Sequence, residues 1–104
     1  NIVVLPYRNP FLVAKAAAIP SLTDVVLMCS AVNVIDMSAL ESIETIQRRV
    51  GEMGARLHLS EVKGPVMDKL SGTEFLRHLT GEVHLSQHQA ILSIARSRGE
   101  HAAA

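Results

Sequence analysis

Aromatic residues are scarce in this chain: it has no tryptophan, one tyrosine and two phenylalanines among 104 residues. With so few rings to stack on exposed bases, binding of single-stranded nucleic acid is not expected. Ten basic side chains balance ten acidic ones when the five histidines are neutral. Because net positive charge is missing, duplex DNA, RNA and anionic membrane surfaces are also poor candidates for partners.

Cysteine is nearly absent as well, since Cys29 is the only one. A disulfide within the chain and a zinc site made of several cysteines are therefore excluded, and we expect neither a metal nor a cofactor. The longest uninterrupted apolar run covers residues 25–29 and is much too short to cross a bilayer. We expect a soluble cytoplasmic fragment that does not itself insert into a membrane.

The apolar pattern predicts alternating strands and helices over residues 1–101, followed by a disordered tail at 102–104. This order indicates a single α/β domain whose sheet of four or five strands is mostly parallel or mixed and is flanked by about four helices. The length is that of one domain. Strands are predicted at 2–5, 24–30, 55–60 and 83–85, and helices at 11–19, 38–53, 66–70, from Thr73 to near Gly81, and from Ser86 onward.

The strongest helical signal runs from residue 38 to residue 53, where apolar residues recur every three or four positions. Ser38 followed by Glu41 has the spacing of a capping box, so Ser38 is predicted to be the N-cap. The next segment, 55–60, alternates apolar and polar residues and predicts a strand with one buried face. On that pattern His58 is expected on the solvated face.

The turn before the long helix is the best place for a functional site. Because it follows the apolar strand at 24–30, it should lie at the carboxyl edge of the sheet, where open α/β folds place their ligands. Ser38 has two interpretations there: a simple helix cap, or a functional serine such as a phosphoryl acceptor. The spacing alone favours the cap. An enzyme that uses Ser38 would need a histidine within hydrogen-bond reach of its hydroxyl, and no local pattern supplies one.

Two segments carry a resemblance to a known family. Residues 29–41, with the run Asp36-Met37-Ser38-Ala39-Leu40-Glu41, and residues 57–66, with the turn Val62-Lys63-Gly64-Pro65, resemble the STAS domain. This domain occurs at the cytoplasmic C-terminus of SulP-type sulfate and anion transporters, and alone as bacterial anti-sigma-factor antagonists. The resemblance extends over roughly residues 23–94. It implies a mixed sheet with helices, no catalytic activity, and a regulatory role through protein contacts.

The resemblance also suggests individual site residues. Antagonists carry Asp-Ser-Ser-Gly, and their second serine, the kinase target, corresponds to Ser38; Met37 and Ala39 depart from that pattern. STAS domains have been proposed to bind nucleotides, which makes Lys63 and Gly64 weak candidates for an anion or nucleotide site. The predicted interaction surface is the turn and helix start: Asp36, Met37, Ser38, Ala39 and Glu41.

The start of the chain differs from the family, which usually has two strands before the first helix. Residues 1–20 have room for about one. Either the first strand is missing or this region is unusual, and a bare sheet edge would favour a homodimer.

The leading interpretation is a non-enzymatic regulatory domain on the cytoplasmic side of a SulP-type anion transporter, in contact with the membrane part of the same chain. The alternative is a free-standing signalling protein of the anti-sigma-factor antagonist type. In that case a kinase or another cytosolic regulatory protein would act at Ser38.

Overall fold

The computed structural model describes residues 1–8 and 10–97, so the tail predicted at 102–104 lies outside the described residues. Strands and helices alternate along the chain, as predicted. The elements are β1 (Ile2–Pro6), the 3-10 helix η1 (Pro10–Ala18), β2 (Asp24–Met28), α1 (Met37–Glu52), β3 (Arg56–Ser60), α2 (Gly64–Leu70), α3 (Glu74–Arg77), β4 (Val83–His84) and α4 (Gln87–Ser97).

The four strands form one parallel sheet in the order β1-β2-β3-β4. Its two inner strands have apolar sequences, as expected for parallel strands covered on both sides. All of β2 except Met28 is buried, and so is all of β3 except Arg56. The predicted α/β fold class is confirmed. β1 lies at one edge of the described sheet, and pairing with a second copy through that edge stays a prediction.

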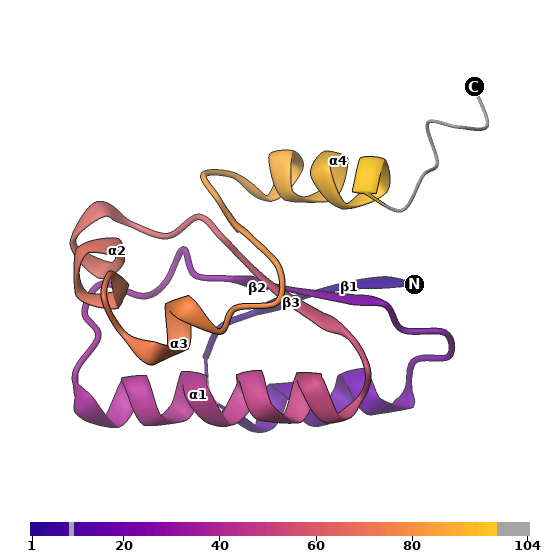
Figure 1. Ribbon diagram of the computed structural model, residues 1–104, viewed down its shortest axis with the longest axis horizontal. Coiled ribbons are helices and arrows are strands. Elements are labelled where there is room, and N and C mark those ends of the chain that lie inside the picture. The colour runs from indigo at the N-terminus through magenta and orange to yellow at the C-terminus, as the bar shows by residue number, and fades with distance from the viewer. Residues whose placement is uncertain (9, 98–104) are drawn as a thin grey trace.

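Helices cover the sheet unequally. Figure 1 shows α1 and η1 on one side of the sheet and α4 alone on the other. The α1 side holds the main core, in which Leu27 and Leu57 pack with Ile43 and Phe75. Among the described residues, the α4 side has a small apolar core of three buried residues, Val26, Ala90 and Ile94, with Ile2, Val4 and Ile91 partly buried against it.

The two helices predicted to begin at Thr73 and Ser86 are capped by the side chains of these residues. The Thr73 hydroxyl accepts a hydrogen bond from the Leu76 amide at the start of α3 (3.3 Å). The Ser86 hydroxyl accepts one from the Gln89 amide in the first turn of α4 (3.1 Å). Both bonds satisfy amides that have no partner inside the helix.

The prediction for His58 was wrong, because its residue is only 3% exposed. The alternating pattern indicated a solvated face for this side of β3, but α4 and β4 cover it. Polar side chains on this face are therefore buried and need partners within the protein.

Gly81 marks a very close approach between the chain before β4 and β3. Its amide donates to the Leu57 carbonyl oxygen (3.0 Å). A methyl group at this position would lie 2.4 Å from that oxygen and 2.5 Å from Nδ1 of His58.

We therefore predict that Gly81→Ala lowers the free energy of unfolding by about 1–3 kcal/mol, through steric overlap in a packed region. Gly51→Ala is the matched control, since Gly51 lies in α1 with nothing within 4 Å of the added methyl group. There the same change should stabilise the protein by up to about 1 kcal/mol through helix propensity. Urea denaturation followed by circular dichroism measures both, and equal effects of the two substitutions would contradict the prediction.

Candidate functional site

The candidate site lies where the parallel strands end. The loop from Cys29 to Asp36 follows β2 and leads into α1, and residues 61–63 follow β3. Because parallel strands end at the same edge, these segments meet there. Lys63 Nζ donates a hydrogen bond to Oδ1 of Asn33, which ties the two loops together.

Asp36, and not Ser38, is the N-cap of α1. Asp36 has an extended backbone, and its Oδ1 accepts a hydrogen bond from the Ala39 amide (2.7 Å). The predicted Ser38 capping box was therefore wrong, because the helix begins one residue earlier, at Met37, and aspartate caps as well as serine does. Ser38 is exposed in the first turn, with its hydroxyl free of any hydrogen bond to the described residues.

Apolar side chains are exposed at this turn. Val34 and Met37 are 72% and 73% exposed, respectively. Beside them is a surface hollow of about 370 Å³ lined by Ile35, Asp36, Met37, Leu40 and Lys69. Its wall is largely aliphatic, with one acidic and one basic group, which suits an apolar side chain of a partner.

Tyr7 supports the turn from β1, and the sequence reasoning did not single it out. It lies just past the strand, and its hydroxyl donates to the Ala39 carbonyl oxygen (3.4 Å). Burial raises the pKa of Tyr7, and the nearby Cys29 and Asp36 act in the same direction. The signal in the sequence was positional: a lone tyrosine directly after a predicted strand belongs at the carboxyl edge.

The other predicted site residues have distinct places. Ala39 is half-buried against the core and Glu41 is exposed on α1. Lys63 is the N-cap residue of α2 without a side-chain cap bond, and Gly64 is the first residue of that helix. The anion or nucleotide site at Lys63 and Gly64 stays a prediction.

Cys29 packs as a small apolar residue. It is 4% exposed, and burial raises the pKa of its thiol to about 12. Since the thiolate is the reactive form, this cysteine is inert at neutral pH.

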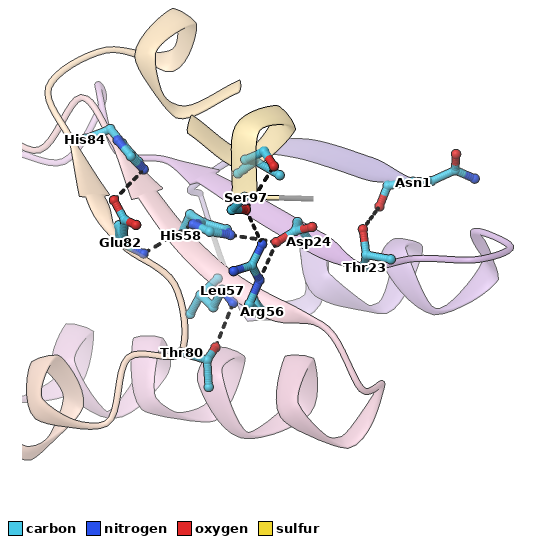
Figure 2. A network of polar contacts seen from close by, with 11 residues as sticks. Asn1, Thr23, Asp24, Arg56, Leu57, His58, Thr80, Glu82, His84 and Ser97 are labelled. Atoms are coloured by element: carbon cyan, nitrogen blue, oxygen red, sulfur yellow. Dashed lines mark hydrogen bonds and ion pairs between the residues drawn. The ribbon is translucent and has the colours of Figure 1, made fainter. Parts of the chain in front are cut away.

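A buried polar cluster lies on the other face of the sheet, and sequence reasoning missed it (Figure 2). Oδ1 of Asp24 contacts Nε2 of His58 at 2.8 Å and Nε of Arg56 at 2.9 Å. The amide of Glu82 donates to Nδ1 of His58 (3.2 Å). A nitrogen that accepts an amide proton carries none itself, so the proton of the neutral ring is on Nε2 and is donated to Asp24.

Burial governs the protonation of this cluster. It lowers the pKa of His58, and the charges of Arg56 and His84 act in the same direction, against the opposing effect of Asp24. Burial alone would raise the pKa of Asp24, but the hydrogen bond from His58 and the charge and hydrogen bond of Arg56 together lower it. At neutral pH the cluster therefore contains an ionised aspartate, an arginine and a neutral histidine.

This cluster does not form a catalytic triad with Ser38. Both ring nitrogens of His58 are occupied, by Asp24 and by the Glu82 amide. No histidine in the described part of the chain is hydrogen-bonded to the Ser38 hydroxyl. The arrangement that a serine nucleophile needs is thus not formed among these residues.

The geometry defines a parallel α/β domain with an exposed turn at the start of a long helix. A family model for the STAS domain matches residues 9–90. The chain therefore belongs to the STAS domain family, whose members are generally non-catalytic regulatory domains. Comparison with curated proteins gave no match. Within residues 1–8 and 10–97, none of the helices is long and apolar enough to span a membrane.

The cap assignment makes a direct prediction. Asp36→Ala should lower the free energy of unfolding by about 1 kcal/mol, because the Ala39 amide loses its partner. Ser38→Ala, two residues away, should change it by less than about 0.5 kcal/mol, because Ser38 is exposed and does not cap the helix. Thermal unfolding followed by circular dichroism distinguishes them, and a larger loss for Ser38→Ala would restore Ser38 as the cap.

Proposed function

We propose that this STAS domain is the cytoplasmic regulatory domain of a SulP-type sulfate or anion transporter, and that it acts by binding the membrane part of the same chain. The observation that carries the proposal is the exposure of Met37. It stands where antagonists of anti-sigma factors have the first serine of Asp-Ser-Ser-Gly. An exposed thioether beside an exposed valine suits an apolar contact with a partner.

The contact would be made by the turn surface, which we define as Val34, Ile35, Asp36, Met37, Ser38, Leu40, Glu41 and Lys69. Full burial of one aliphatic side chain contributes about 1.5–3 kcal/mol. Two exposed apolar side chains and one hollow therefore support only a weak contact.

A weak contact is sufficient when both partners belong to one chain. A short tether raises the effective concentration of the partner to about the millimolar range, so the second binding event needs little affinity of its own. A free-standing domain would need a larger exposed patch for the same occupancy. The small size of the turn surface thus supports a partner in the same chain, and a cytoplasmic loop with one protruding aliphatic side chain fits the hollow.

The reading frame that encodes this domain tests the transporter context. This frame should also encode roughly ten or more apolar spans, each of about 20 residues, ahead of Asn1. A frame that encodes this domain alone would contradict the proposal and favour the free-standing alternative.

We predict that Met37→Asp in the full-length parent protein changes the rate of radiolabelled sulfate uptake in cells at least severalfold, because a carboxylate in the turn surface opposes burial. Leu92→Asp is the matched control. Leu92 is a 44% exposed apolar residue on α4, on the opposite side of the sheet from α1. The domain should remain folded in both variants, since substitutions of exposed residues change the free energy of unfolding by about 0.5 kcal/mol or less. Equal uptake in the two variants and the wild type would contradict the proposed contact.

The exposure of Ser38 favours a second candidate function, that of an antagonist-type protein switched by phosphorylation. A phosphate there would add about −1.5 to −2 charges in the first turn of α1. The macrodipole of the helix favours this charge, whereas the neighbouring Asp36 opposes it. Because these effects offset each other, the modification would leave the fold intact and change the charge of the turn surface.

This alternative predicts that a cell extract of the host, supplied with ATP, phosphorylates the domain at Ser38. Ser38→Ala should lose that modification, and it keeps the half-buried Ser42 of α1 as an internal control. Peptide mapping by mass spectrometry gives the site. If Ser38 stays unmodified under conditions in which the extract phosphorylates a known substrate, the switch is contradicted and the docking role stands alone.

A further inference from the structure

α4 is held to the sheet by little apolar surface. Its buried residues are Ala90 and Ile94, which pack on Val26. A polar contact completes the attachment: Nη2 of Arg56 donates to the Ser97 hydroxyl (2.9 Å), which in turn donates to the Ile94 carbonyl oxygen (2.9 Å). Elements with few buried apolar contacts are the ones that open at low free energy.

His58 lies at the point where the β4–α4 unit joins the sheet. Three hydrogen bonds, each 3.0 Å long, join the chain entering β4 to β3. The Leu57 amide donates to Thr80 Oγ1, and the Gly81 amide donates to the Leu57 carbonyl oxygen. The Leu59 amide donates to the Glu82 carbonyl oxygen. A fourth bond runs from the Glu82 amide to Nδ1 of His58 (Figure 2). Unlike the other three, it forms only while Nδ1 carries no proton.

A second proton on the His58 ring would have to go to Nδ1, because Nε2 already carries one toward Asp24. The new N–H would then face the N–H of Glu82, and a hydrogen bond would become a repulsion. His58 is only 3% exposed, and its ring lies directly against Gly81, where an added methyl group would be 2.5 Å from Nδ1. The segment entering β4 must then move.

The charged groups around the His58 ring have opposing effects on its protonation. Asp24 favours the added proton, but its Oδ1 is already shared by His58 and Arg56. The Arg56 guanidinium and the His84 ring, 6.2 Å from that of His58, oppose it. The Glu82 carboxylate is exposed and lies 3.8 Å from His84. On α4, the titratable and charged residues that the structure describes, His88 and Arg96, are exposed.

We propose that His58 is a proton-operated latch: its neutral ring fastens the segment entering β4 to β3, and protonation at Nδ1 releases β4 and α4 from the sheet. Release would uncover Val26 and the apolar side of α4, while the main core under α1 stays closed. The STAS domain would then expose a second apolar surface only in acid.

The direction of the pH dependence follows from linkage. Burial lowers the pKa of His58 in the closed form, whereas the open form should have the ordinary value of about 6.5. The open form thus binds more protons below that value. The equilibrium constant for release should be constant above pH 6.5 and should rise up to tenfold for each pH unit below it, until the pKa of the closed form is reached.

Nuclear magnetic resonance of the isotope-labelled chain, titrated from about pH 7.5 to pH 5, tests the latch. We expect the ring nitrogens of His58 to report the Nε2–H tautomer at neutral pH. Below pH 6.5, the amides of residues 80–97 should move toward random-coil shifts with the same midpoint as the His58 ring. The amides of α1 should keep their positions.

His58→Asn is the informative variant, because its side-chain oxygen can still accept the Glu82 amide but does not titrate. It should abolish the pH dependence of the 80–97 amides, and His88→Asn, an exposed histidine on the same helix, should leave it unchanged. If His58→Asn fails to fold, the wild-type titration alone decides. The proposal is overturned if His58 titrates at or above 6.5, if it titrates while α4 stays in place, or if α4 opens identically in a folded His58→Asn variant.

Discussion

Burial of β2 and β3 on both faces is the constraint on which the rest of the structure depends. It follows from a parallel sheet with helices on both sides, an arrangement that also brings the loops after these strands to one edge. Burial also favours internal partners for the polar side chains on the two strands. Asp24, Arg56 and His58 partner one another on the α4 face, whereas Oδ2 of Asp24 and the Ser60 hydroxyl have no partner among the described residues.

The sequence allowed several helices to be predicted on both sides of the sheet, because their signals are local. The long apolar stripe of α1 and the caps at Thr73 and Ser86 depend on residues three or four positions apart. The environment of His58 could not be found this way. Its partner Asp24 is 34 positions earlier in the chain. The alternating pattern of β3 also does not predict that α4, near the end of the described chain, covers the polar face of the strand. At Asp36 two good capping residues stood two positions apart, and only the backbone path decides between them.

The two faces of the sheet consequently have different mechanical properties. The α1 face has the larger apolar core, and elements with many buried apolar contacts are those that open least readily. The turn surface is attached to this face through Asp36, Tyr7 and the first turn of α1. The α4 face combines three buried apolar residues with a titratable cluster. A partner that binds the turn surface meets a rigid support, whereas changes of protonation act on the opposite layer.

The two proposed uses of the turn surface also constrain each other. Met37 and Ser38 are adjacent, so a phosphate on Ser38 would lie next to the side chain that an apolar partner covers. Burying such a group without a specific cationic partner carries a large desolvation penalty, and Lys69 supplies one positive charge in the same hollow. Phosphorylation would therefore weaken an aliphatic contact at Met37 even where the fold is unchanged. A kinase acting on a transporter of this kind would release the domain from its membrane part, so the switch and the docking role are consistent uses of one surface.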